Sequence, residues 1–349
     1  MSTIFKAAKE MSTTSKGTDW FERITGFVEG HYQWTQEQLR VEGDQLVSLK
    51  DDSRHHMGKF EMTSLAEFRA LSPQTGSNQV QTKTVIGDAR SLHADPANAG
   101  ATFQVASQFN ALEMVGPDIT PEHGVTRYAL DRTQGPACAM ATGAGTIWRN
   151  YLVPVGEQIG QTTEQQIDGL STLGEALSEM LGIPVPDLWS MQNGYALGKL
   201  HGIKAVSQML RTLDIERKDW LRSLLCVGWH QDVDVTDLPP TSRHQVNQVY
   251  CSALPVAYSG LPSHIWEPFA RLVLEAAYEA TLRAAWIKAE NNGSPRVLLT
   301  GIGAGVFGND PLWVADAITH ALNQVQGSGL EVHLVGYREV PEHFKRFNC

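Results

Sequence analysis

The feature that most constrains the fold is a strand, a glycine-rich loop and a capped helix that follow one another near the carboxyl end. Arg296 to Thr300 has the pattern of a buried strand, and Asp310 with Pro311 is a typical helix start. The stretch Gly303-Ala-Gly-Val-Phe-Gly308 lies between them. Upstream, apolar residues on one face and charged residues on the other predict a long helix from Glu267 to Ala289. This order indicates an α/β fold.

The rest of the chain repeats the alternation of strand and helix signals from about residue 83 onward. We expect further strands at 84–86, 101–107, 224–235, 248–257 and 332–335, and further helices at 137–152, 172–181, 189–212 and 310–327. Such a pattern predicts a mixed central sheet between two helical layers, a three-layer α/β/α architecture.

Two segments stand outside this pattern. Residues 1–80 are polar and irregular and are expected to form an N-terminal extension, with residues 72–78 as a linker. Residues 156–222 interrupt the remaining domain, 81–349, and are expected to be a helical insertion.

Composition excludes several classes of protein. The chain of 349 residues has 28 Lys and Arg against 38 Asp and Glu, a net charge of -10, which argues against general nucleic-acid binding. An apolar content of 42% excludes disorder, and no apolar run is long enough for a membrane span. The amino terminus lacks a secretory pattern and the four cysteines form no Cys-x-x-Cys pair, so we expect a cytoplasmic protein.

Two glycine-containing segments have the properties of phosphate-binding loops. Successive glycines between Gly303 and Gly308 let backbone N–H groups converge on an anion without a lysine. Residues 134–140 open another predicted helix and offer a second set of N–H groups. The alternative for the first loop is a tight turn without a ligand. Its Gly-x-Gly-x-x-Gly spacing also fits an NAD(P)-dependent oxidoreductase, but only about forty residues follow Gly308, too few for further βα units.

Polar side chains follow two of the predicted strands. Asp88 comes after the first and its carboxylate suits an exocyclic amine; Asn110 comes after the second and its amide suits a sugar diol. The alternative for each residue alone is the capping of a turn.

The order of these motifs resembles that of the macrodomain family: Gly87-Asp88-Ala, Ser107-Gln-Phe-Asn110, Gly135, the long helix and the glycine loop. The resemblance covers about residues 83–155 and 223–340 and implies binding of ADP-ribose or of an ADP-ribosylated protein, with no cofactor. It implies the following contacts: adenine at Asp88 and Ala89, distal ribose at Asn110, a first phosphate loop at Gly135, Pro136, Ala137, Cys138 and Ala139, a second at Gly303, Ala304, Gly305, Val306, Phe307 and Gly308, and an adenine-stacking aromatic at Tyr337.

The sequence also departs from the family pattern. Ser107-Gln-Phe-Asn110 replaces Asn-Ala-Ala-Asn, the first loop lacks a glycine triplet, and the acid or histidine of the family's hydrolases is missing from residues 135–146. Catalytic candidates are therefore Asn110 at the ribose and the nearest carboxylates, Glu113 and Asp131, as general bases. The alternative for each carboxylate is a turn cap or a structural pair.

Three functions follow. The first is ADP-ribose binding with hydrolysis of an ADP-ribosyl linkage. The second is binding of ADP-ribose without hydrolysis, as in a reader module, and the third is the NAD(P)-dependent oxidoreductase.

Cys138 at a helix start suggests either a nucleophile or a small residue packed under a phosphate loop. His55-His56 and the Asp232-x-Asp234-x-x-Asp237 run lack metal-ligand spacing, so no metal is expected.

Overall fold

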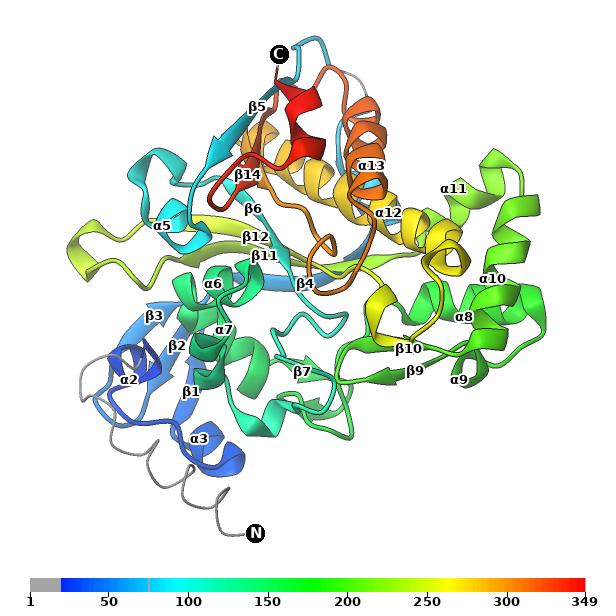
Figure 1. Ribbon diagram of the computed structural model, residues 1–349. Helices are drawn as coiled ribbons and strands as arrows, with labels where there is room; N and C mark the ends of the chain where they lie inside the picture. The colour runs from blue at the N-terminus through cyan, green and yellow to red at the C-terminus, as the bar shows by residue number, and fades with distance from the viewer. Residues whose placement is uncertain (1–19, 75, 349) are drawn as a thin grey trace.

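The computed structural model describes residues 20–74 and 76–348, and its centre is a seven-stranded mixed sheet (Figure 1). The strand order is β4-β11-β12-β6-β13-β14-β5. The five strands from β12 to β5 run parallel to one another, whereas β11 is antiparallel to both β4 and β12. The carboxyl ends of five strands therefore meet at one edge of the sheet.

The sheet strands are β4 (Lys59–Ser64), β5 (Gln81–Ile86), β6 (Thr102–Ala106), β11 (Cys226–Asp234), β12 (Gln245–Cys251), β13 (Arg296–Leu299) and β14 (Glu331–Gly336). The helices are α2 (Trp20–Thr25), α3 (Tyr32–Glu37), α4 (Leu65–Leu71), α5 (Ala89–Ala94), α6 (Gln134–Ala141), α7 (Gly143–Tyr151), α8 (Ser171–Leu181), α9 (Val185–Leu188), α10 (Leu200–Thr212), α11 (Ile215–Ser223), α12 (Ser263–Glu290) and α13 (Pro311–Gln324).

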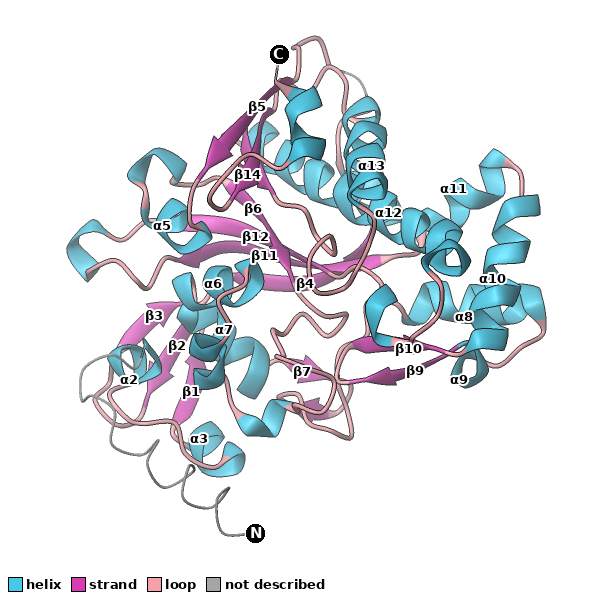
Figure 2. Cartoon of the chain, viewed as in Figure 1, coloured by secondary structure: helices cyan, strands magenta, loops and turns pink. Residues whose placement is uncertain are grey.

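Helices cover both faces of the sheet, so the predicted α/β/α layering and mixed sheet are confirmed (Figure 2). On one face, α12 and α13 pack with α4 over alternating strand residues such as Val249, Val297 and Leu299. On the other face, α5, α6 and α7 cover Val105, Tyr250 and their neighbours. This alternation follows from the two-residue period of a strand.

The predicted strands and the two carboxyl-terminal helices are confirmed with small shifts of their ends. Asp310 caps α13 by accepting a hydrogen bond from the Leu312 N–H at 2.8 Å. Gly182 ends α8 in the left-handed conformation, with φ of 66°. The strand expected to run to residue 257 ends at Cys251, and the helix expected over 137–152 breaks at Thr142 into α6 and α7.

The segment before residue 80 contributes to the central sheet. β4 pairs with β11 along six residue pairs, from Lys59 with Gln231 to Ser64 with Cys226. A small antiparallel sheet precedes it, formed by β1 (Leu39–Glu42), β2 (Gln45–Ser48) and β3 (Arg54–His56). Residues 20–74 thus pack against the domain that was predicted for residues 81–349. Residues 1–19 lie outside the described part of the chain.

The expectation of a helix over 189–212 is wrong at its start. β9 (Trp189–Gln192) and β10 (Tyr195–Gly198) form a hairpin, and helix α10 begins only at Leu200. Asn193 and Gly194 join the strands with φ of 47° and 78°, the geometry that Asn-Gly favours in a two-residue turn. With the short strands β7 (Pro154–Val155) and β8 (Gln158–Ile159), the predicted insertion is mixed in structure.

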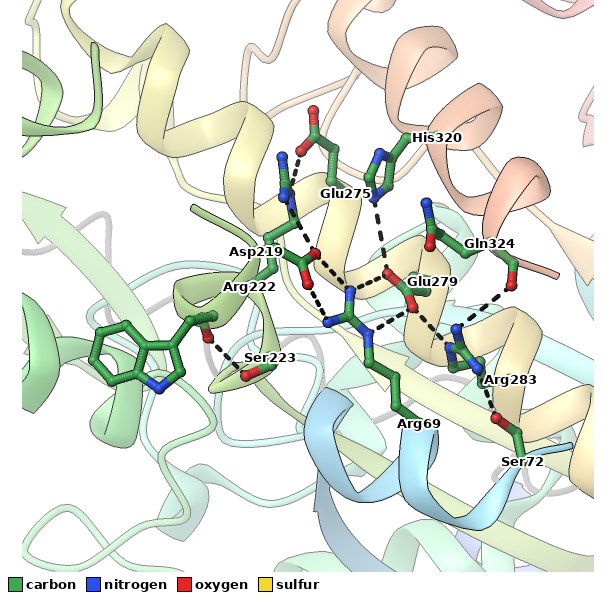
Figure 3. Close-up of polar contacts among 11 residues, drawn as sticks. Arg69, Ser72, Asp219, Arg222, Ser223, Glu275, Glu279, Arg283, His320 and Gln324 are labelled. Carbon is green, nitrogen blue, oxygen red and sulfur yellow. Dashed lines mark hydrogen bonds and ion pairs between the residues drawn. The ribbon is translucent and has the colours of Figure 1, made fainter. Parts of the chain in front are cut away.

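A buried ion cluster joins four helices on the α12 face (Figure 3). Glu279 of α12 accepts hydrogen bonds from Arg69 Nε of α4 at 2.8 Å and from Arg283 Nε at 2.7 Å. Arg69 also binds Asp219 of α11, and His320 Nε2 of α13 lies 3.8 Å from the Glu279 carboxylate. Burial alone would raise the pKa of Glu279, but His320, Arg69 and Arg283 outweigh it and lower the pKa to about 2.

No helix within residues 20–74 and 76–348 combines the length and the apolar character that crossing a membrane requires.

Candidate functional site

A groove runs along the edge where the parallel strands end. It consists of two adjoining cavities of about 250 and 300 Å³, which share Ala106, Thr133, Gln134 and Gly301. Ligands of open α/β sheets bind outside the carboxyl ends of the strands, because the loops there diverge and leave a crevice. The groove is therefore the candidate site.

One end of the groove holds a carboxylate beside an exposed aromatic ring. Asp88 and Tyr337 follow β5 and β14 and line the same cavity. Asp88 caps α5, since its Oδ1 accepts a hydrogen bond from the Ser91 N–H at 3.0 Å. Its Oδ2 has no hydrogen-bond partner among the residues described, so the cap and a ligand contact are compatible.

The middle of the groove is lined by the glycine loop after β13. Gly303 and Gly308 have φ of 74° and 72°, values that side chains other than glycine rarely adopt. Within the described part of the chain, the N–H groups of Gly305, Val306 and Phe307 make no hydrogen bond. An added Cβ at Gly305 would meet nothing within 4 Å, so the backbone faces open space. Free backbone amides in a glycine-rich loop are groups that can bind an anion.

The amino terminus of α6 faces the glycine loop across the groove. The helix begins at Gln134, earlier than expected, so Gly135 to Ala139 are helical and not a loop. The N–H groups of Gln134 and Gly135 lack partners among the described residues, and the helix dipole adds positive potential there. The Gln134 side chain holds the helix on β6, because its Oε1 accepts from the Ala106 N–H at 3.0 Å and its Nε2 donates to Gln104 O at 2.9 Å.

Glu113 lies in the other end of the groove with only 3% of its surface exposed. Neither carboxyl oxygen accepts a hydrogen bond from any described residue, and Oε1 is wholly buried. Burial raises the pKa of Glu113 well above the ordinary carboxyl value, since the opposing charge of Arg149 is too weak to offset it and Asp131 adds to the rise. The raised pKa favours the protonated form of this side chain, a carboxylic acid that can donate a proton.

The backbone of α6 comes directly against this carboxyl group. A Cβ added at Gly135 would overlap Glu113 Oε2 and Ala106 O. The glycine thus allows Glu113 to occupy the space that a side chain at 135 would fill. Buried Arg149 is close enough to influence the pKa of Glu113, but its own contacts are elsewhere: it donates to His230 Nδ1 at 2.8 Å and lies 3.8 Å over the Tyr250 ring.

The structure places the other two catalytic candidates differently. Asn110 is fully buried, donates to Gln166 Oε1 at 2.8 Å and accepts from the Leu112 N–H at 3.0 Å, so its amide is turned away from the groove. Asp131 lines the groove, where its Oδ1 accepts from the Thr133 N–H at 2.8 Å. Its second oxygen is free of hydrogen bonds and ion pairs with the described chain.

Several predicted contacts lie beside or below the groove. Ala89, Pro136, Ala137, Gly303, Val306 and Phe307 are among the residues that line it. Cys138 and Ala139 are fully buried beneath it, and burial raises the pKa of the Cys138 thiol, so the structure favours packing over nucleophilic chemistry. Ala304 and Gly308 belong to the loop without lining either cavity.

Among the groove-lining residues that sequence reasoning did not single out are Tyr195 and Tyr258. Tyr195 comes from the hairpin β9-β10, which the Asn193-Gly194 pair signalled. Tyr258 follows β12 in a turn that no local pattern indicates.

No set of three or more His, Cys, Asp or Glu side chains suited to a metal ion occurs in residues 20–74 and 76–348.

Comparison with known proteins gives matches in structure alone. No protein-family model matches the sequence, and no curated protein does either. The chain is similar in structure to poly(ADP-ribose) glycohydrolase from Deinococcus radiodurans in complex with ADP-ribose, with 13% identity, a TM-score of 0.44, and coverage of 82% of this chain and 93% of that one. The same enzyme from Thermomonospora curvata matches with 13% identity, a TM-score of 0.42, and coverage of 88% and 91%. A second structure of that enzyme, bound to the inhibitor ADP-HPD, matches at 14% identity, with the same TM-score and coverage. Because the TM-scores are low, function has to be inferred from the residues of this chain.

Proposed function

We propose that this protein binds ADP-ribose in the groove, in the manner of a macrodomain, and hydrolyses the bond that joins the distal ribose to a target. Adenine lies between Asp88 and Tyr337, the pyrophosphate lies between the glycine loop and α6, and the distal ribose lies at Glu113. The observation that carries the proposal is the order of these three features along one continuous groove.

The groove binds an anion through backbone amides in place of lysines. Arg132 is the one Lys or Arg among the described residues that line the two cavities. The free N–H groups of Gly305, Val306 and Phe307 and the amino terminus of α6 supply the positive potential for two phosphates. The Asp88 carboxylate accepts from an exocyclic amine, and Tyr337, 60% exposed, offers a ring face to a base.

Glu113 supplies the catalytic step as a general acid. Its raised pKa favours the protonated acid, which gives its proton to the leaving atom of the target as the bond to the anomeric carbon breaks with its electron pair. Water then adds its oxygen to the anomeric carbon, and one of its protons returns to Glu113. The products are ADP-ribose and the unmodified target, and no further reactant is required.

Titration calorimetry with ADP-ribose, ADP and NAD tests the binding site. We expect ADP-ribose to bind more tightly than ADP, since it adds the distal ribose, and Asp88→Ala to weaken both ligands. Thermal unfolding gives a second measure, because ADP-ribose at 100 times its Kd should stabilise the protein by about 2.7 kcal/mol. Absence of both signals would overturn the proposal.

A reader without turnover is the second candidate, favoured by the orientation of Asn110, whose amide is committed inside the protein. Mass measurement after incubation with a mono-ADP-ribosylated peptide separates the two, since release of ADP-ribose excludes a pure reader. The oxidoreductase has less support, because the dinucleotide-binding fold carries its glycine-rich loop after the first strand, whereas this loop follows β13, which five other strands of the sheet precede in the chain.

A further inference from the structure

Three aromatic rings form one wall at the Glu113 end of the groove. Tyr195 comes from β10, Tyr258 from the short helix η6 (Val256–Tyr258), and Phe307 from the glycine loop. The Tyr195 ring centroid lies 5.4 Å from those of Tyr258 and Phe307, and these two lie 5.6 Å apart. In the proposed binding mode, adenine and pyrophosphate lie elsewhere in the groove, so this wall is available to the group beyond the distal ribose.

The wall offers ring faces rather than hydroxyl groups at its inner end. The Tyr195 hydroxyl donates to Met114 O at 2.6 Å and accepts from Gln108 Nε2 at 3.3 Å. Both roles of this hydroxyl are taken, which fixes the ring. Tyr195 is only 2% exposed, so it supports the half-buried rings of Tyr258 and Phe307, which are the ones open to contact. Exposed Val115 and Val306 continue the apolar surface toward solvent.

The charge around the wall is negative. Asp131 lines the same cavity and has one carboxyl oxygen without a partner in the described chain. Burial first, and then the charge of Asp131, raises the pKa of Tyr258, which places this carboxylate within electrostatic range of the wall. No Lys or Arg among the described residues lines this cavity, so Asp131 has no competing cation there.

We infer that the group joined to the distal ribose in the preferred ligand is a planar cation attached through nitrogen, such as the guanidinium of an arginine side chain or the pyridinium of NAD. Aromatic faces attract a delocalised cation, and a guanidinium both stacks on rings and pairs with a carboxylate. The next unit of a poly(ADP-ribose) chain would instead bring a pyrophosphate toward Asp131 without a cation to receive it. This inference rests on the proposed function.

Atoms and charges balance in the cleavage step for either cation. With a guanidinium, the carbon–nitrogen bond breaks with its electron pair moving to nitrogen, Glu113 protonates that nitrogen, and water replaces it at the anomeric carbon and returns a proton to Glu113. With a pyridinium, the ring leaves as a neutral base, and the proton of the attacking water passes to solvent.

The inference is tested by binding titrations with Glu113→Gln, which removes the proton donor that cleavage of the peptide ligands requires. Cleavage of NAD does not use that proton, so the NAD sample is checked by mass measurement after the titration. The ligands are free ADP-ribose, NAD, and one peptide carrying mono-ADP-ribose on arginine or on serine, with the unmodified peptide as a blank. We expect the arginine-linked peptide or NAD to bind about 5 to 10 times more tightly than the serine-linked peptide. Equal or tighter binding of the serine-linked peptide would overturn the inference while leaving the proposed function intact. Failure of free ADP-ribose to bind would overturn both.

Two tyrosines at opposite ends of the groove give matched variants. Tyr258→Leu and Asp131→Asn should each reduce the ratio of arginine-linked to serine-linked affinity by about 3 to 10 times. Tyr337→Leu, at the adenine end, should weaken both ligands equally and leave the ratio as it is. A ratio that stays the same in both Tyr258→Leu and Asp131→Asn would rule out recognition by the wall.

Discussion

Glu113 and Glu279 are glutamates buried in different layers of the same molecule, and their surroundings act on their charges in opposite directions. Glu279 is enclosed by Arg69, Arg283 and His320, which hold the pKa of its carboxyl group at about 2 (Figure 3). Glu113 has no hydrogen bond to either carboxyl oxygen in the described chain, and its pKa is raised. Burial alone therefore does not determine the direction in which the pKa of a carboxyl group shifts.

The difference lies in what each carboxyl group has left to bind. Glu279 has every strong interaction satisfied by α4, α12 and α13, so it contributes to the assembly of these helices and is closed to a ligand. Glu113 combines the cost of burial with an unused oxygen and an open groove. Unsatisfied, shifted groups of this kind are candidates for functional sites.

The first prediction concerns Glu113→Gln, which keeps the shape and removes the proton donor. We expect the release of ADP-ribose from a modified peptide to slow by about 10² to 10⁴ times, the usual contribution of a general acid. ADP-ribose binding and folding should persist, because the amide keeps the size and shape of the carboxyl group. A rate equal to that of the wild type in this variant would show that Glu113 is not the general acid.

The second prediction concerns Glu279→Gln, where the loss should be in stability. Removing the charge leaves buried Arg283 without its carboxylate and leaves Arg69 with Asp219 alone, at a cost of about 3 to 5 kcal/mol in the free energy of unfolding by urea. Glu267→Gln on the same helix is the control, since its pair with Arg271 is partly exposed and should contribute at most about 0.5 kcal/mol. Equal effects from the two variants would show that the buried cluster is not stabilising.

The third prediction is that pH acts in opposite directions on the two variants. The folded pKa of Glu279 lies below the ordinary 4.5, so its contribution, roughly 3 kcal/mol, is present above that value and is lost as the pH falls toward 2. The deficit of Glu279→Gln should shrink over this range.

For Glu113 the folded pKa is raised, so ionisation of the unfolded chain above 4.5 makes the wild type less stable as the pH increases. Glu113→Gln should accordingly gain stability relative to the wild type, and wild-type turnover should fall as the acid ionises. Unfolding free energies across pH 2 to 8 measure both trends, and parallel curves for the two variants would contradict the assignment.

The fourth prediction concerns Gly135→Ala, which places a methyl group where Glu113 lies. The overlap with Glu113 and with the Ala106 carbonyl should cost about 1 to 3 kcal/mol of stability and slow turnover by displacing the acid. Gly116→Ala is the control, because a Cβ there would meet nothing within 4 Å. Normal turnover and stability in Gly135→Ala would show that the close approach is unimportant.

The sequence is sufficient to predict the layers of the fold, because they depend on local patterns. The apolar face of α12 and the Asp310 cap of α13 are fixed by residues near in the chain. The hairpin β9-β10 was missed because its apolar residues also fit a helix, and the Asn193-Gly194 turn was the better signal. The place of β4 in the sheet depends on pairing with β11, more than 150 residues away in sequence, for which no local pattern exists.

In the candidate site, too, some features follow from local sequence patterns and others depend on contacts between distant segments. Asp88, Gly303 and Glu113 follow strands whose ends meet, so sequence order placed them near one groove. Asn110 turns inward because Ala111 has φ of 57° and Gln166, in the insertion, binds the Asn110 amide. That contact and the aromatic wall arise from segments distant in the chain. The ligand roles of the groove residues stay predictions.

The most direct test of the account is a crystal structure of Glu113→Gln with ADP-ribose. The account predicts adenine beside Asp88 and Tyr337, the pyrophosphate on the amides of the glycine loop and α6, and the anomeric carbon within reach of the side chain at position 113, directly or through one water. A ligand bound in the reverse direction, or outside the groove, would contradict it.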